Sequence, residues 1–230
     1  MTQRGKKYKK ALEALGKKQV FSLQEGVAKV KQLAYARFDE SVDVHTILGI
    51  DPTKGDQVVR GSTILPHGIG KQIKIVVFAK GEYADEATKA GADFVGAEDL
   101  IEKIEGGWLD FNYAIATPDL MGLVGRVAKI LGPRGLLPNK KSGTVTFDVK
   151  TIVSDLKKGR LFFKNDKSGL VHFTVGKVSF APEKLQENLT AFLRALASNK
   201  PSTSKGKFIR KVTLSSTMGP GIQINADELL

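Results

Sequence analysis

The chain has 230 residues, of which 41% are hydrophobic and none is cysteine. This length predicts one or two domains with real cores, and the absence of cysteine excludes disulfides, thiolate metal sites and thiol catalysis. We expect a cytoplasmic protein, because the sequence contains neither an apolar run long enough for a bilayer nor a secretory signal. The formal net charge of +12 favours a nucleic acid as partner. The alternative is a basic surface without any partner.

The positive charge is concentrated at the two ends of the chain. Residues 1–67 carry a net charge of +5 and residues 160–230 carry +6, whereas residues 68–159 carry only +1. A polyanion is therefore expected to meet the two ends, and the ends could form one surface.

The N-terminal segment predicts two helices and a strand. ALEALGKK (11–18) and SLQEGVAKVKQLAYA (22–36) have helical patterns, and Ser22 with Glu25 makes a capping box for the second helix. SVDVHTILGI (41–50) alternates with period two, which places Val42, Val44 and Thr46 on one face of a strand.

The middle segment alternates between strands and helices. Strands are predicted at 71–81, 92–96 and 111–117, and helices at 82–91, at 97–107, from a cap at Asp119 to Ile130, and at 149–159. Lys157 and Lys158 lie in the last turn of the final helix, where cations suit the helix dipole. Strands separated by helices of this length indicate parallel βαβ units. We therefore predict a small Rossmann-like domain with three layers.

The C-terminal segment predicts an antiparallel arrangement. Residues 160–178 form a predicted hairpin whose turn is Asn165-Asp166-Lys167-Ser168-Gly169. Residues 182–196 form an amphipathic helix with Pro182 in its first turn, and residues 207–217 form a closing strand. The predicted fold is thus a discontinuous two-domain protein of α/β and α+β class. Residues 1–67 and 160–230 form an antiparallel α+β domain, residues 68–159 are inserted into it, and the hinge residues are Pro66, His67, Gly68 and Gly159.

No motif supports an enzyme. HGIGKQ (67–72) lacks the GxxxxGK[ST] spacing of a phosphate-binding loop and enters a strand instead of a helix. MGLVGRVAKILGPRG (121–135) contains no GxGxxG, and a Rossmann-like fold by itself does not establish a nucleotide site. The three histidines, His45, His67 and His172, have no metal-binding spacing. His45 is expected to be a packed or edge residue, while His172 could contact phosphate or ribose.

Two loops leave alternatives open. LGPRGLLPNKKSG (131–143) is either a rigid crossover loop with solubilising charges or a phosphate contact through its cations. SSTMGPGIQIN (215–225) is either a plain turn or an RNA contact. In the second case its hydroxyl groups reach 2′-hydroxyls and base edges, Met218 offers an apolar surface, and glycine permits close approach of the backbone.

Several segments together resemble the bacterial L-one family of large-subunit ribosomal proteins. They are FDESVDVHTILGID (38–51), MGLVGRVAKI with LGPRGLLPN (121–139), KNDKSGLVH (164–172) and STMGPG (216–221). They occur in the family's order, and the resemblance covers essentially the whole chain. Lys140 departs from the pattern, because many relatives have proline there, and it leaves that loop less rigid.

The resemblance implies two domains joined by a hinge, the first built from both chain ends. It implies that this first domain binds ribosomal RNA at the mobile side stalk of the large subunit and a similar structure on the protein's own messenger RNA, whose translation it represses. It also implies a place near the exit of deacylated tRNA, whose release the protein assists. No cofactor, metal or enzymatic activity is expected.

The resemblance also carries functional roles to particular residues. The expected RNA-binding residues are Phe38, Thr217, Met218, Gly219, Ser215, Ser216, Arg37, Asp166, Lys167, Ser168, His172, Arg4, Lys6 and Lys7. The residues expected to face tRNA are Arg126, Arg134, Lys140 and Lys141. Phe38 is either a core aromatic or an exposed ring that stacks on RNA. Two competing functions stay open: a nucleotide-dependent enzyme, and a free-standing RNA-binding repressor without a ribosomal role.

Overall fold

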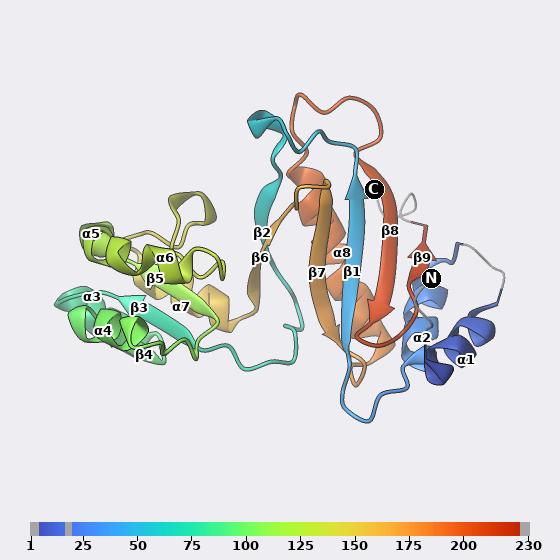
Figure 1. The fold of residues 1–230 in the computed structure, drawn as a ribbon, viewed down its shortest axis with the longest axis horizontal. Coiled ribbons are helices and arrows are strands. Elements are labelled where there is room, and N and C mark those ends of the chain that lie inside the picture. Colours follow the sequence, from blue (N-terminus) through green and yellow to red (C-terminus); the bar gives the residue numbers. More distant parts are fainter. Residues whose placement is uncertain (1–4, 17–19, 226–230) are drawn as a thin grey trace. The chain divides into compact units, whose positions relative to one another are not determined.

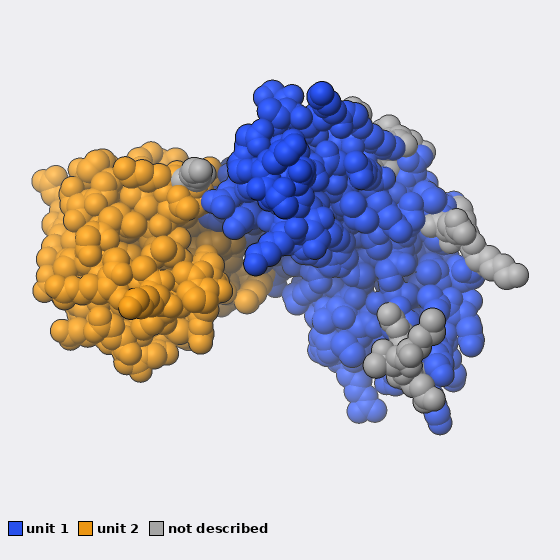
Figure 2. Space-filling view, turned by 45° about the horizontal axis from the view of Figure 1, so that its top comes forward, with its two compact units in different colours: residues 1–70, 161–230 blue, residues 71–160 orange. Residues whose placement is uncertain are grey.

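The computed structural model describes residues 5–16 and 20–225. Its contacts divide the chain into two units, coloured separately in Figure 2. Unit 1 contains residues 1–70 and 161–230, and unit 2 contains residues 71–160. The chain therefore passes between the units twice, between Gly70 and Lys71 and between Arg160 and Leu161.

A four-stranded antiparallel sheet forms the centre of unit 1 (Figure 1). Its order is β7-β1-β8-β9, with bounds Leu170–Lys177 for β7, Ser41–Leu48 for β1, Ile209–Ser216 for β8 and Ile222–Ile224 for β9. A separate two-stranded sheet joins β2 (Arg60–Ile64) to β6 (Arg160–Lys164). A 3₁₀ turn, η1 (Gly55–Gln57), precedes β2.

Helices cover one face of the four-stranded sheet. Helix α2 (Leu23–Leu33) contacts β8 and β9, and α8 (Pro182–Ser198) contacts β7 and α2. Helix α1 (Lys6–Leu15) contacts α2. The predicted alternation in β1 is confirmed, because Val42, Val44 and Thr46 are buried while the residues between them are not. The sheet therefore has a core face under the helices and a second, polar face.

Local signals at the helix starts are also confirmed. Ser22 caps α2, and its hydroxyl and the Glu25 carboxylate satisfy each other's backbone N–H groups in a capping box. Pro182 is in the first turn of α8, where its missing N–H costs no hydrogen bond.

The predicted hairpin over residues 160–178 is wrong. Strand β6 pairs with β2, and β7 pairs with β1. An isolated bridge between Asn165 and Val171 and a hydrogen bond from the Asp166 N–H to the Leu170 carbonyl close the turn. The turn is therefore that of a hairpin, but beyond it the two strands take their main-chain partners from different sheets.

Unit 2 contains a three-stranded parallel sheet of order β4-β3-β5 (Figure 1). Its bounds are Ile75–Phe78 for β3, Phe94–Gly96 for β4 and Tyr113–Ala116 for β5. Strand β3 is shorter than the predicted 71–81. Just before it, the Lys74 N–H donates to the side chain of Asn112 at 3.0 Å, and the Lys74 carbonyl accepts the Asn112 N–H at 2.9 Å. One antiparallel and one parallel sheet confirm the predicted mixture of α+β and α/β structure.

Helices pack on both sides of this parallel sheet. They are α3 (Glu82–Lys89), α4 (Glu98–Glu105) and α7 (Val149–Lys157). Val76 and Phe78 lie in one core cluster with residues of α4. Ile75 and Val77 are fully buried as well, and successive side chains of a strand point to opposite faces. Helices α3 and α7 contact each other and α3 contacts β3, which accounts for the second face.

The predicted helix from Asp119 to Ile130 is not continuous. The segment consists of short turns, η2 (Pro118–Leu120), α5 (Met121–Val124), η3 (Gly125–Val127) and α6 (Ala128–Leu131), and a further turn, η4, spans Lys140–Ser142. Asp119 lies inside η2, and the N-cap position belongs to Thr117. Gly122 lies within α5 and Gly125 is the first residue of η3. Glycine inside a helix costs about 1 kcal/mol relative to alanine, which disfavours a continuous helix here.

Candidate nucleic-acid interface

The loop that follows β8 is hydrogen-bonded to the start of β1. The Thr217 N–H donates to the Ser41 carbonyl at 3.1 Å, and the Ser41 N–H donates to the Thr217 hydroxyl oxygen at 3.0 Å. Gly219 lies close to Ser216, and a Cβ at position 219 would overlap the Ser216 hydroxyl oxygen. The glycine is thus required by close packing within the loop, and the Thr217 hydroxyl already has a structural partner.

A buried carboxylate, Glu40, connects this loop to the segment before β1. Glu40 is only 1% exposed. One of its oxygens accepts the N–H groups of Tyr35 and Ala36 at 3.0 and 2.7 Å, and the other accepts the N–H of Met218 at 3.0 Å. The Tyr35 hydroxyl donates to the Met218 carbonyl at 2.7 Å and makes a second connection. The loop and the segment 35–40 are therefore one structural group.

The surroundings of Glu40 favour its charged form. Burial alone raises the pKa of Glu40, but the Ser216 side chain and the N–H groups of Met218, Ala36 and Tyr35 outweigh it and lower the pKa below the ordinary value of 4.5. The Ser216 hydroxyl acts by proximity, since it makes no hydrogen bond of normal geometry. Glu40 is thus an ionised group inside the fold at neutral pH.

Glu40 is the residue that sequence reasoning missed, although a signal was present. It precedes Val42, Val44 and Thr46 in the same period-two phase, so it had to point into the core. A charged side chain on a core face needs compensating hydrogen bonds. The position of Glu40 in this alternation therefore indicated a buried carboxylate that accepts hydrogen bonds from the surrounding backbone.

Two large apolar side chains are exposed on these connected segments. Phe38 is 57% exposed and Met218 is 51% exposed. The alternative interpretation of Phe38 as a core aromatic is therefore wrong. An exposed ring and an exposed thioether on a hydrogen-bonded backbone can stack on unpaired bases or riboses.

The same loop lines an open groove with basic residues from the chain start. The groove has a volume of about 670 Å³ and is lined by Gly5, Lys6, Lys7, Tyr8, Tyr35, Thr217, Met218 and Gly219. Lys6, Lys7 and the nearby Arg37 are exposed. The structure thus brings the predicted phosphate contacts Lys6 and Lys7 to the predicted specificity loop. Arg4 lies outside the described residues.

The predicted contacts of the 166–168 turn lie at the other end of the sheet. The Asp166 carboxylate accepts the N–H groups of Ser168 and Leu170, both at 2.8 Å, and Gly169 has a φ of +77°. The Leu48 N–H donates to the Gly169 carbonyl, so the turn adjoins the end of β1 opposite to Ser41. Eight residues of β1 separate the two ends, which is roughly 25 Å at about 3.3 Å per residue.

A row of polar contacts crosses the polar face of the sheet between these two ends. His45 and His172 face each other across β1 and β7, with their Nδ1 atoms 2.8 Å apart. His45 Nε2 lies 3.1 Å from the Ser215 hydroxyl oxygen, and His172 Nε2 lies 3.7 Å from an Asp166 carboxylate oxygen. His45 is thus on a central strand, not at an edge.

The predicted tRNA-facing residues belong to unit 2. Arg126 lies in η3, Arg134 in the following loop and Lys140 in η4, and all three are exposed. The side chain of Lys141 lies outside the described part of the structure. These residues therefore belong to a different unit from the groove.

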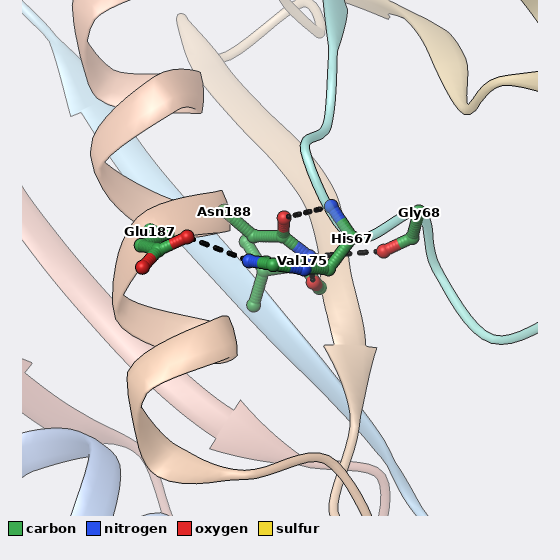
Figure 3. A network of polar contacts seen from close by, with 5 residues as sticks. All are labelled: His67, Gly68, Val175, Glu187 and Asn188. Carbon is green, nitrogen blue, oxygen red and sulfur yellow. Dashed lines mark hydrogen bonds and ion pairs between the residues drawn. The ribbon is translucent and has the colours of Figure 1, made fainter.

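The predicted hinge residues His67 and Gly68 are bound to α8 through a buried amide (Figure 3). Asn188 is fully buried, accepts the His67 N–H at 3.1 Å and donates to the Gly68 and Val175 carbonyls at 2.9 and 2.8 Å. His67 Nε2 lies 2.6 Å from a Glu187 carboxylate oxygen. The boundary between the two units lies between Gly70 and Lys71, two residues after Gly68 in the sequence. Pro66 is exposed, and Gly159 is buried in unit 2.

Metal-binding and membrane-spanning features are not found within residues 5–16 and 20–225. No group of histidine, aspartate and glutamate side chains in these ranges is arranged to hold a metal ion. No helix in them has the length and apolar character needed to cross a bilayer.

Comparison with known proteins identifies the class of this chain. The model of a family described as the Ribosomal protein L1p/L10e family matches residues 30–220. The chain therefore belongs to this family of ribosomal proteins, as the sequence resemblance predicted.

Named relatives match nearly the full length. The large ribosomal subunit protein uL1 of a Thermus thermophilus strain is 52% identical over 226 residues, which cover 98% of this chain and 99% of that protein. The large ribosomal subunit protein uL1 of Desulfotalea psychrophila is 49% identical over 225 residues, which cover 98% of this chain and 96% of that protein.

Proposed function

We propose that this chain is a non-enzymatic constituent of the large ribosomal subunit in the cytoplasm and that it binds large-subunit rRNA at the mobile side stalk. Family membership and near-complete coverage of two proteins named for the large subunit support the ribosomal role. The observation that supports the RNA site is the groove in which Lys6 and Lys7 adjoin the Thr217–Gly219 loop.

The proposed site divides affinity and specificity between different groups. The lysines attract phosphates, and their contribution should fall with added salt because it depends on counterion release. Phe38 and Met218 supply apolar surfaces for stacking, which carries about 1–3 kcal/mol per base. Glu40 is a positioning residue, since its hydrogen bonds hold both apolar side chains on one backbone framework.

Binding of the full chain to a transcript of the side-stalk rRNA tests this site. We expect Met218→Ala and Phe38→Ala each to weaken binding by about tenfold or more at every salt concentration, as loss of stacking predicts. Both side chains are exposed, so the fold should survive. Phe147→Ala is the matched control, because Phe147 is 47% exposed and belongs to unit 2. Wild-type affinity in both site variants would overturn the assignment.

We further propose that the same surface binds the protein's own messenger RNA and represses its translation. A protein with a single RNA surface should bind the side-stalk transcript and the messenger leader in competition. Simultaneous binding of both RNAs to one chain would contradict this. Co-sedimentation with large subunits through a high-salt wash distinguishes a ribosomal constituent from a free-standing repressor.

The proposed role of unit 2 is to assist release of deacylated tRNA from the exit site. Its exposed cations Arg126, Arg134 and Lys140 support this proposal. Replacing all three with alanine should slow tRNA release from ribosomes while leaving binding to the side-stalk transcript unchanged. An unchanged release rate would remove these residues from the proposed tRNA surface.

A further inference from the structure

The polar face of the four-stranded sheet carries a histidine pair. His172 is among the expected RNA contacts, but neither histidine lines the groove of the proposed site. Among the described residues, the helices that contact the sheet pack on its core face, where Val44, Phe173 and Leu214 are buried. On the opposite face His172 is exposed and His45 is half-buried. His45 lies opposite His172 on β7 and opposite Thr213 on β8, so the two rings lie side by side on the central strand β1 and the edge strand β7.

One arrangement of protons satisfies every contact of the pair when both rings are neutral. His172 carries its proton on Nε2, which faces the Asp166 carboxylate at 3.7 Å. Its Nδ1 then accepts from His45 Nδ1–H across 2.8 Å. His45 Nε2 accepts from the Ser215 hydroxyl at 3.1 Å. The opposite arrangement would leave a lone pair of His172 facing a carboxylate, which is unfavourable.

Uptake of one proton by His172 reverses the donor and acceptor roles along this row of hydrogen bonds. If His172 Nδ1 is protonated, it must donate to His45 Nδ1, and His45 must carry its own proton on Nε2. His45 then donates to the Ser215 oxygen, and the Ser215 hydroxyl proton becomes available to an acceptor on the polar face. A second proton is disfavoured, because two N–H groups would oppose each other across 2.8 Å. The pair can therefore hold one added proton without opposed N–H groups, and it then gains one positive charge.

Charged groups around the pair are mixed in sign. Asp43 lies two residues before His45 on β1 and accepts from the Thr174 hydroxyl at 2.6 Å. Lys211, on β8, is opposite Ile47 on the same face as the rings, and Asp166 adjoins His172 from the turn. Burial lowers the pKa of His45 and the His172 charge lowers it further, while Asp43 raises it. The protonated pair thus requires an additional anion to be populated near neutral pH.

We propose that the His45–His172 pair is a proton-linked phosphate site, which takes up one proton when the RNA backbone lies across the polar face of the sheet. This inference rests on the proposed RNA-binding function and adds a contact between the two ends of the sheet. The positive charge of the singly protonated pair attracts a phosphate, and the released Ser215 hydroxyl is the donor that a phosphate oxygen accepts. The pair lies between the Thr217 loop and the Asp166 turn, so RNA bound at the loop can extend over it.

Binding to the side-stalk transcript between pH 5.5 and pH 8 tests the proton linkage. Uptake of one proton should raise the association constant as pH falls, by at most about tenfold per pH unit. Titration calorimetry in buffers of different ionisation enthalpy should show the same proton uptake directly. His45→Gln and His172→Gln should each abolish this pH dependence.

His67→Gln is the matched control, because the chain has three histidines and His67 contacts Glu187 away from this face. This variant should keep the wild-type pH dependence. A wild-type affinity that does not change with pH, or an unchanged pH dependence in both pair variants, would overturn the inference. If Met218→Ala still weakens binding in that case, the proposed function stands and only the proton-linked site fails.

Discussion

Carboxylates organise loops at both ends of the unit 1 sheet, but they act over different distances. Glu40 is buried and joins backbone groups of Tyr35 and Ala36 to Met218, which lies 178 residues away in the chain. Asp166 is more exposed and accepts N–H groups only from Ser168 and Leu170 within its own turn. The first carboxylate assembles a surface from distant segments, whereas the second shapes a single turn.

This difference supports the proposal that the main RNA site lies at the Glu40 end of the sheet. At the Glu40 end, the exposed Met218 and lysines from a separate part of the chain line one groove, and the exposed Phe38 lies on the segment that Glu40 connects to Met218. At the Asp166 end, Lys167 and Ser168 are exposed on a turn whose conformation depends on its own hydrogen bonds. A surface assembled from distant segments can combine apolar and basic side chains. Such a surface depends strongly on the group that connects its segments.

The largest effect is therefore expected from loss of Glu40. Glu40→Ala leaves three backbone N–H groups without their acceptor, which should lower the free energy of unfolding by about 3 kcal/mol. Because Phe38 and Met218 then lose their common framework, affinity for the side-stalk transcript should fall by about 100-fold, a loss typical of central interface residues. Urea unfolding and equilibrium RNA binding measure the two quantities.

Glu40→Gln is the matched control for this prediction, because it keeps one acceptor oxygen and the side-chain volume. Its losses should be clearly smaller than those of Glu40→Ala. Equal RNA affinity in the wild type and Glu40→Ala would contradict the connecting role of Glu40.

The lowered pKa of Glu40 predicts that the folded protein loses stability in acid. The folded-state pKa of Glu40 lies below its ordinary value of 4.5, so its contribution to stability is complete above pH 4.5 and is lost as pH falls through the folded-state pKa. The difference in unfolding free energy between wild type and Glu40→Gln should accordingly shrink below pH 4.5. Thermal unfolding from pH 7 to pH 3 measures it, and a constant difference over this range would disagree with the prediction.

A smaller effect is expected from the lysines of the groove. Replacing Lys6 and Lys7 with glutamine should reduce the slope of log affinity against log salt by about 1 to 2, since each lost phosphate contact removes about 0.7 to 0.9. Discrimination between the side-stalk transcript and an unrelated RNA should stay nearly unchanged. Lys184→Gln with Lys200→Gln changes the same charge outside the groove and should leave the slope unaltered.

The smallest effect is expected from Asp166→Asn. The asparagine oxygen can still accept the Ser168 and Leu170 N–H groups, so stability should fall by about 1 kcal/mol or less. Affinity for the side-stalk transcript at pH 8 should change by less than about threefold, as expected for a peripheral contact. A loss comparable with that of Glu40→Ala would remove the distinction between the two ends of the sheet.

Much of the fold was predictable from local sequence patterns. The alternation of Val42, Val44 and Thr46 identified a strand with one core face, and Ser22 with Glu25 identified a helix start. The alternating elements of the middle segment identified the parallel sheet. These features depend on residues that are close together in the sequence, so local spacing patterns predict them.

The remaining features depend on contacts between distant residues. The turn around Gly169 indicated a hairpin, but pairing of β6 with β2 depends on packing that no local pattern records. Phe38, Thr217, Met218 and Gly219 were selected by family resemblance. Their connection through Glu40 required the structure, because its acceptor bonds extend over 178 residues of sequence.

Photo-cross-linking of the full chain to a 4-thiouridine-substituted side-stalk transcript tests whether the surface connected by Glu40 binds RNA. Peptide mapping would locate the cross-links on the protein. We expect the main cross-links in the segment 35–41 and in the Thr217–Gly219 loop, with weaker ones near His172. Main cross-links within residues 71–160, with none at Phe38 or Met218, would contradict it.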